Sequence, residues 1–231
     1  MNDSMHNLTL PLANRLRARR ARLSWWWHTR RGPVAKRVLD LLLVAPALLL
    51  LAPLLALLAL AIRLHDGGPV LFWQRRVGRH GVEFEFPKFR SMRVDAEALR
   101  ARLLAANQHG EKGVTFKLQR DPRITPVGRF IRRASLDELP QLWCVLRGTM
   151  SLVGPRPPLP AEVARYTLDD RERLAVTPGL TCIWQVNGRS EVPFPQQVQM
   201  DLDYIRRPSL WADLKLLLKT LPAVVRGRGA Y

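Results

Sequence analysis

An adjacent pair of carboxylic acids, Asp137 and Glu138, is followed a short distance later by the turn Gly154-Pro-Arg-Pro157. A carboxylate can attack phosphorus or bind Mg²⁺, and an arginine guanidinium can hold phosphate oxygens. The chain around these residues is basic, with a formal net charge of +18. These residue types, in these surroundings, predict chemistry on a phosphorylated substrate.

Ser135 offers a structural alternative for Glu138. The two residues have the Ser-x-x-Glu spacing of a capping box, in which both side chains satisfy free N–H groups at the start of a helix. If Ser135 caps a helix, both carboxylates lie in its first turn, where the helix dipole favours their ionised form. An ionised Asp137 would be a competent nucleophile or metal ligand. Both interpretations of Glu138 stay open at this point.

The positive charge makes nucleic acid a candidate partner. The chain has no zinc-finger, RNA-recognition or KH signature, and its aromatic residues do not alternate with basic ones as stacking platforms would. We therefore expect no nucleic acid partner, and we expect much of the charge to face solvent or anionic membrane lipid. The arginines inside motif-like segments are the functional candidates: Arg76, Arg90, Arg132, Arg156 and Arg189.

The uncharged segment from Leu41 to Ile62 is long enough to cross a bilayer. Pro46 and Pro53 lie inside it, and each removes a backbone hydrogen bond and favours a kink. Both flanks are basic, so the preference of positive charge for the cytoplasmic side gives no single orientation. A re-entrant helix that breaks at Pro53 and returns to the same face explains both features. A true span and a buried soluble helix are the alternatives.

Short elements must position the acidic pair. Residues 70–73 and 83–86 are predicted strands, and residues 128–133 and 197–207 are predicted helices. Residues 184–189 are predicted to run from a strand into a turn. Residues 209–225 carry leucines at helical spacing, which fits a core-packing helix or a helix on the membrane surface. Before the apolar segment, Trp25 to Trp27 favour a membrane interface and residues 12–23 could form a surface helix or a disordered basic tail.

Seven motifs in order resemble the bacterial sugar transferases that act as monotopic polyprenyl-phosphate phosphoglycosyl transferases. They are Lys36-Arg37-x-x-Asp40, Gln74-x-Arg76-Val77-Gly78, Lys88-Phe-Arg90-Ser-Met92, Ser135-Leu-Asp-Glu-Leu-Pro-Gln141, Ser151-Leu-Val-Gly-Pro-Arg-Pro157, Pro178-Gly179 and Gln185-Val-Asn-Gly-Arg189. The resemblance runs from about Lys36 to the C-terminus, and it depends on the shared order rather than on any single motif.

The resemblance implies transfer of a sugar-1-phosphate, expected to be a hexose-1-phosphate, from a UDP-sugar to undecaprenyl phosphate with release of UMP. Asp137 is implied to attack the β-phosphorus and form an aspartyl-phosphosugar intermediate, with Mg²⁺ bridging Asp137 and the diphosphate. Glu138 is implied to handle a proton or position phosphate. The product would start a lipid-linked glycan such as exopolysaccharide, capsule or O-antigen.

The resemblance also implies which residues bind the substrates. Phosphate oxygens would be held by Arg132, Arg156, Arg76, Lys88 and Arg90, and the donor-site candidates are Gln185, Asn187 and Arg189. The sequence departs from the family pattern at Ala52, Cys144, Thr149 and Cys182. None of these departures touches the acidic pair, although Thr149 puts in doubt a metal or helix-start role for its position.

The implied fold is an α-rich α+β core, attached to the membrane from one side, with an N-terminal re-entrant helix broken at Pro53 and surface amphipathic helices. We expect a flexible basic extension over residues 1–33, the membrane helix over 34–64 and a catalytic domain over 65–231. This domain would lie on the cytoplasmic face of the bacterial inner membrane, as a small family member without an extra N-terminal domain, and it could form a homo-oligomer. A catalytically silent membrane scaffold of the same fold is the alternative, and the motifs do not identify the sugar.

Overall fold

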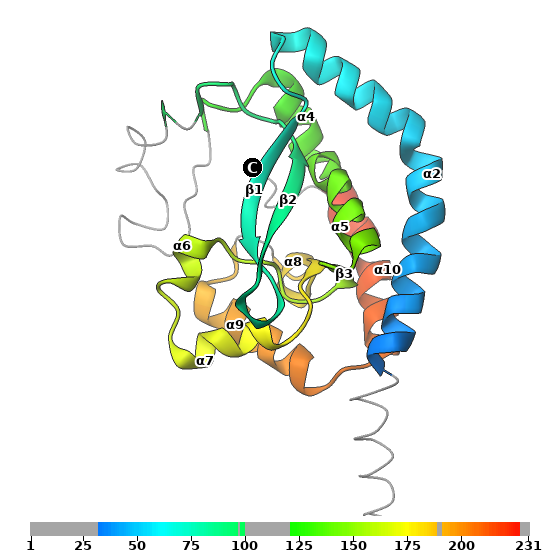
Figure 1. Ribbon diagram of the computed structural model, residues 1–231, viewed down its shortest axis with the longest axis vertical. Helices are drawn as coiled ribbons and strands as arrows, with labels where there is room; N and C mark the ends of the chain where they lie inside the picture. The colour runs from blue at the N-terminus through cyan, green and yellow to red at the C-terminus, as the bar shows by residue number, and fades with distance from the viewer. Residues whose placement is uncertain (1–31, 97, 100–120, 189–190, 227–231) are drawn as a thin grey trace, which may run out of the picture.

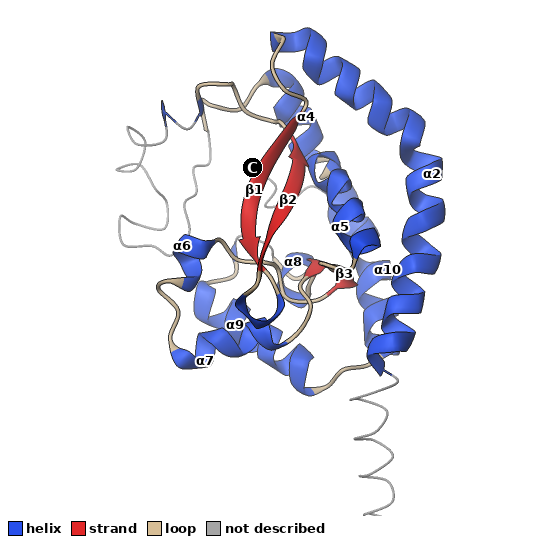
Figure 2. Cartoon of the chain, in the orientation of Figure 1, coloured by secondary structure: helices blue, strands red, loops and turns tan. Residues whose placement is uncertain are grey.

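The computed structural model describes residues 32–96, 98–99, 121–188 and 191–226, which form a mostly helical fold with two small sheets (Figures 1 and 2). The predictions for residues 1–31 and for Arg189 lie outside the described residues. The elements, in chain order, are α2 (Gly32–Asp66), β1 (Leu71–Val77), η3 (Arg79–Gly81), β2 (Glu83–Phe89), α4 (Pro126–Arg133), η5 (Leu136–Gln141), α5 (Leu142–Arg147), β3 (Ser151–Val153), α6 (Pro160–Val163), α7 (Leu168–Arg171), η6 (Glu172–Ala175), β4 (Gly179–Thr181), α8 (Ile183–Val186), α9 (Phe194–Arg206) and α10 (Leu210–Arg226).

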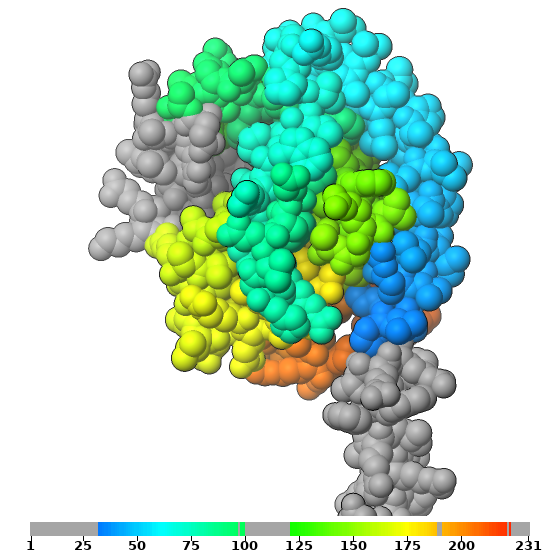
Figure 3. All heavy atoms as spheres, viewed as in Figure 1, coloured from blue at the N-terminus to red at the C-terminus, as the bar shows by residue number. Residues whose placement is uncertain are grey.

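The long apolar helix α2 runs from Gly32 to Asp66 without interruption, through both of its prolines. It curves along one edge of the protein, where it is blue to cyan (Figures 1 and 3). Many of its leucines face outward, and Leu49 and Leu50 are 78% and 79% exposed. An exposed apolar surface on a helix of this length is compatible with membrane association. The re-entrant path and the break at Pro53 stay predictions.

The two predicted strands, residues 70–73 and 83–86, are confirmed as β1 and β2, and the structure pairs them as an antiparallel hairpin. In its register Gln74 lies opposite Phe86, and Phe72 lies opposite Lys88. Because side chains alternate along a strand, Gln74 and Arg76 share one face with Phe86 and Lys88. Strand β2 packs against η5, so this face of the hairpin is turned towards the acidic pair.

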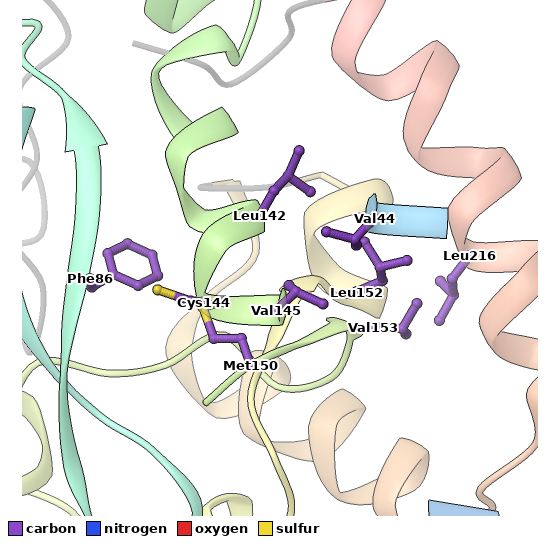
Figure 4. Packing of buried hydrophobic residues seen from close by; sticks show 9 residues of the cluster. All are labelled: Val44, Phe86, Leu142, Cys144, Val145, Met150, Leu152, Val153 and Leu216. Atoms are coloured by element: carbon purple, nitrogen blue, oxygen red, sulfur yellow. The ribbon is translucent and has the colours of Figure 1, made fainter. Parts of the chain in front are cut away.

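Apolar packing between α5, β3 and α2 forms the main core (Figure 4). Val145 and Met150 are almost fully buried there, and Val44 of α2 lies beside Leu152 of β3. Cys144 belongs to the same cluster. This core joins α2 to α5, which follows the acidic pair, and to β3, which precedes the Gly154-Pro-Arg-Pro157 turn. Helix α10 contributes buried Leu216, while its Trp211 and Leu218 are exposed, so this predicted amphipathic helix both packs and presents an apolar surface.

The strand predicted to begin at residue 184 is wrong, because the chain forms helix α8 after Cys182. The predicted turn is confirmed at residues 187–188. Strand β4 ends at Thr181, and the following turn of helix brings Trp184 into a buried cluster with Cys182 and Val192. Burial of a large aromatic side chain outweighs the local strand preference of these residues.

Strands β3 and β4 pair in parallel, with Ser151 opposite Gly179 and Val153 opposite Thr181. The backbones of the two strands approach closely at Gly179, where an added Cβ would lie 2.0 Å from the backbone nitrogen of Gly154. No flexible side chain is involved that could move aside. The pairing therefore needs a glycine at position 179.

Gly179→Ala is expected to lower the free energy of unfolding by about 2–4 kcal/mol, because β3 and β4 must separate to admit the methyl group. Thermal unfolding in detergent measures the change. Gly81→Asn is the control: its backbone has φ +81° with open space around it, and asparagine tolerates this left-handed conformation. Wild-type stability for Gly179→Ala would contradict the close contact.

Candidate active site

The acidic pair lies at the start of η5, a six-residue 3-10 helix. Ser135 precedes it with φ 54°, and its side chain makes no capping hydrogen bond. The capping-box interpretation of Glu138 is therefore wrong. Two cationic side chains from distant segments bind Glu138 instead, and such charge-assisted hydrogen bonds are stronger than a bond to a backbone N–H.

Glu138 binds Arg156 and Lys88 through one carboxylate oxygen. Arg156 Nη2 donates to Oε1 at 2.7 Å, and Lys88 Nζ lies 3.4 Å from the same atom. Burial alone would raise the pKa of Glu138, but Arg156 and then Lys88 lower it well below its usual range. Glu138 is therefore a permanent counter-ion for both cations near neutral pH.

Asp137 behaves differently from its neighbour. Its side chain is buried, and no hydrogen bond reaches it from the described residues. Burial, followed by the charge of Glu138, raises the pKa of Asp137 to about 6, although Lys88, Arg132 and Arg156 act in the opposite direction. The predicted effect of the helix dipole is outweighed, because a short 3-10 helix offers little compensation for burial beside a second carboxylate.

Arg76 fixes the Gly-Pro-Arg-Pro turn against the hairpin. Its Nη1 donates to the carbonyl oxygen of Pro157 at 3.0 Å, and its Nε donates to Gln74 Oε1 at 2.9 Å. Burial, and then repulsion from Arg156, lowers the pKa of Arg76 to about 10. Gln74 was not among the predicted site residues. The strand alternation that places it beside Arg76 was the available signal.

Lys88 completes the cationic side of the site. Burial lowers its pKa to about 8, with Glu138 opposing the change. Arg132, in the last turn of α4, acts on Asp137 through its charge. The structure thus brings Arg76, Lys88, Arg132 and Arg156 together around the acidic pair. Two carboxylates with pKa values driven apart are typical of catalytic pairs.

The sequence model of the bacterial sugar transferases matches residues 31–227. The chain belongs to the bacterial sugar transferase family. The match covers the long helix, the hairpin and every described residue of the cationic cluster.

Three relatives illustrate the similarity. The undecaprenyl-phosphate galactose phosphotransferase of Salmonella typhimurium is 49% identical over 72% of this chain and 35% of its own length. The UDP-glucose:undecaprenyl-phosphate glucose-1-phosphate transferase of Xanthomonas campestris is 41% identical over 86% of this chain and 40% of its own length. The exopolysaccharide production protein ExoY of Rhizobium meliloti is 42% identical over 87% of this chain and 89% of its own length. The sugar transferase chain thus spans less than half of the first two relatives and most of the third.

Not every predicted site residue of this sugar transferase reaches the acidic pair. The guanidinium of Arg90 pairs with Asp66 at the end of α2 and lies against Gly68. Arg90 therefore has a structural role at the end of α2, away from the acidic pair. Thr149 donates to the carbonyl oxygen of Cys144 at 3.1 Å, which places it at the end of α5.

Two of the donor-site candidates, Gln185 and Asn187, are described, and they lie on α8 and directly after it. Gln185 accepts a hydrogen bond from Cys182 Sγ at 3.0 Å. Asn187 directly follows the last residue of α8. Gln185 is thus held by Cys182, a residue that the sequence identified only as a departure from the family pattern.

Proposed function

We propose that this sugar transferase moves a hexose-1-phosphate from a UDP-sugar to undecaprenyl phosphate and releases UMP. The observation that best supports this proposal is the environment of Asp137. Its carboxylate has no hydrogen-bond partner among the described residues, and it lies beside Glu138, which is bound by two cations. The names of the relatives include UDP-glucose, galactose and undecaprenyl phosphate, which supports UDP-glucose or UDP-galactose as the donor. The product would start a lipid-linked glycan such as an exopolysaccharide.

In the proposed first step, an Asp137 oxygen attacks the β-phosphorus of the UDP-sugar. The bond from this phosphorus to the α,β-bridging oxygen breaks, UMP leaves with that oxygen, and the sugar phosphate stays on Asp137 as an acyl phosphate. In the second step, a phosphate oxygen of undecaprenyl phosphate attacks the same phosphorus and releases the carboxylate. Two steps allow a soluble donor and a membrane-bound acceptor to use the site in turn.

Phosphate oxygens would be held by Arg156, Lys88 and Arg132, with Arg76 keeping the arginine-bearing turn in place. Arg156 uses one nitrogen for Glu138, which leaves other donors of its planar fork for substrate. Because the pKa of Glu138 lies well below its usual range, we propose that it positions these cations rather than transferring a proton.

We also propose Mg²⁺ as a cofactor, held by Asp137 and by the diphosphate of the donor. Among the described residues no group of three or more His, Cys, Asp or Glu side chains could enclose a metal. A single carboxylate, that of Asp137, together with the diphosphate fits Mg²⁺, which proteins commonly bind through one or two carboxylates and substrate phosphates. When bound, the ion would neutralise charge on the diphosphate.

For the membrane, we propose that residues 34–64 form a re-entrant helix that breaks near Pro53, with the catalytic domain, residues 65–231, on the cytoplasmic face of the inner membrane. The exposed leucines and basic flanks of α2 support this arrangement. The protein could also form a homo-oligomer. A tag at Met1 that is accessible only from the periplasm would contradict the re-entrant path.

The proposed roles predict a bell-shaped pH profile. Asp137 attacks when ionised, so kcat/KM for the UDP-sugar should fall below its pKa of about 6. Lys88 holds phosphate when protonated, so kcat/KM should fall above its pKa of about 8. Initial rates of UMP release between about pH 5 and 9.5 measure both limbs, and Lys88→Arg should move only the alkaline limb, to higher pH. A flat profile over this range would contradict both roles.

The proposed function is tested by UMP release from protein in lipid nanodiscs, with Mg²⁺, undecaprenyl phosphate and a panel of UDP-sugars. We expect UMP from UDP-glucose or UDP-galactose, and multiple turnovers only when the lipid phosphate is present. A silent scaffold would bind a UDP-sugar in a calorimeter and release no UMP from any donor.

A further inference from the structure

Three polar residues near the beginning of α2 turn towards the protein: Lys36, Arg37 and Asp40. Their spacing puts Asp40 on the same side of the helix as the other two. Lys36 binds Asp213 at 2.5 Å and Tyr204 at 3.2 Å, which ties α2 to α10 and α9. The proposed chemistry uses none of the three, although they belong to the first motif of the sequence.

Arg37 caps the C-terminal end of α5, the helix that continues from η5 and the acidic pair. Its guanidinium donates to the carbonyl oxygens of Val145 and Leu146, the second at 2.7 Å. These carbonyls belong to the last turn of α5, which ends at Arg147, where backbone oxygens have no partner within the helix. Because α5 continues directly from η5, Arg37 anchors the end opposite Asp137.

Asp40 holds the strand that leads to Arg156. Its Oδ1 accepts a hydrogen bond from the backbone N–H of Leu152 at 3.0 Å, and the carboxylate is only 4% exposed. The N–H groups of Ser151 and Gly154 bond to the segment that contains β4, whereas that of Leu152 points to the other edge of β3. Asp40 therefore supplies the partner that a neighbouring strand would otherwise provide.

We propose that Arg37 and Asp40 are positioning residues for phosphoryl transfer. From one helix they hold the two segments that bear Asp137 and Arg156, and so they set the contact between Arg156 and Glu138. This inference rests on the proposed function. Since α2 is also the proposed membrane helix, the same contacts place the acidic pair at a fixed position relative to the bilayer.

Asp40→Leu keeps the size of the side chain and removes the acceptor for Leu152. We expect kcat for UMP release to fall by about 10²-fold, as small displacements in an active site commonly cause, with KM for the UDP-sugar within about 3-fold of wild type. Asp40→Asn retains the acceptor oxygen and should restore kcat.

Val44→Ala is the matched control. Val44 lies one turn further along α2, and it packs in the same cluster as Val145 and Leu152 (Figure 4). This variant weakens the same helix contact without removing a hydrogen bond, so it should lose thermal stability while kcat stays near wild type. Hydrogen exchange over residues 148–156 should increase in Asp40→Leu and not in Asp40→Asn.

If Asp40→Leu does not fold, Arg37→Gln provides the same test through α5, with Arg37→Lys as the conservative variant. Wild-type kcat in Asp40→Leu or Arg37→Gln would overturn the inference and leave the proposed function intact. Equal losses of kcat in Asp40→Leu and Val44→Ala would also overturn it, since weaker packing of α2 against the core would then explain the loss of kcat without any role for the hydrogen bond. No UMP from the wild-type protein would remove the proposed function, and the inference with it.

Discussion

Asp137→Asn is expected to abolish UMP release, with a loss of at least about 10³-fold in kcat, because an amide cannot form the acyl phosphate. The change keeps the shape of the side chain, so binding of the UDP-sugar should persist and can be checked by calorimetry. Asp169→Asn makes the same substitution at an exposed position on α7, and it should keep activity within about 2-fold. Appreciable turnover in Asp137→Asn would exclude Asp137 as the nucleophile.

The same substitution should make the protein more stable at neutral pH. The pKa of Asp137 is raised from 3.8 to about 6 in the folded state, so between these values the folded protein holds a proton that the unfolded chain has released. Stability therefore falls as pH rises through this window and stays reduced above it. Asparagine carries no charge, and we expect a gain on the order of 1–3 kcal/mol at pH 7. Thermal unfolding should show this gain shrinking as pH falls towards 4.

A combined loss of activity and gain in stability has a clear physical meaning. A residue that only supports the fold would lower both quantities when it is replaced. A buried carboxylate beside Glu138 is instead an unfavourable arrangement that the fold retains, as expected of a catalytic group. If Asp137→Asn is less stable than wild type at pH 7, Asp137 is not an unfavourably buried, ionised carboxylate in the folded protein.

Arg156→Met should have the second largest effect. We expect kcat/KM for the UDP-sugar to fall by about 10²–10³-fold, because a cation aimed at the phosphates is lost. Unfolding free energy should also fall by about 2–4 kcal/mol, because Glu138 stays buried with Lys88 as its remaining bonded partner. Initial rates and thermal unfolding measure the two effects.

Arg156→Lys separates charge from geometry. Lysine restores the positive charge but lacks the planar fork that binds Glu138 and that we propose binds phosphate as well, so stability should recover more than kcat/KM. Arg147→Met is the control, since Arg147 is exposed on α5. If Arg156→Met and Arg147→Met have equal kcat/KM, phosphate is bound elsewhere.

The sequence predicted the acidic pair and Arg156 as site residues from their types and order, and the structure places Arg156 in contact with Glu138. Alternation of polar and apolar residues predicted the strand over residues 83–86, and leucine spacing predicted α10. The pairing of β1 with β2 was not predicted. Glu138 could not be separated from a capping role in this way. The residues that bind Glu138 come from β2 and from the turn after β3. A local sequence pattern does not show such partners, because only the tertiary fold brings them close to Glu138.

Arg90 and α2 show the same limit. Lys88 and Arg90 are two residues apart and would share a face in a continued strand, but β2 ends at Phe89 and Arg90 turns to Asp66 instead. The apolar length of α2 was evident from composition. The contacts that Arg37 and Asp40 make with α5 and β3 were not, because they join residues more than a hundred positions apart.

The most direct test of the proposed mechanism is to look for the sugar phosphate on Asp137. Wild-type protein is incubated with Mg²⁺ and the active UDP-sugar in the absence of undecaprenyl phosphate, and intact mass and peptide masses are then measured. We expect a mass increase of one hexose phosphate on the peptide that contains Asp137, with UMP released in equal amount and no adduct in Asp137→Asn. UMP release that occurs only with the lipid present, and without any adduct, would show direct transfer and contradict the covalent intermediate.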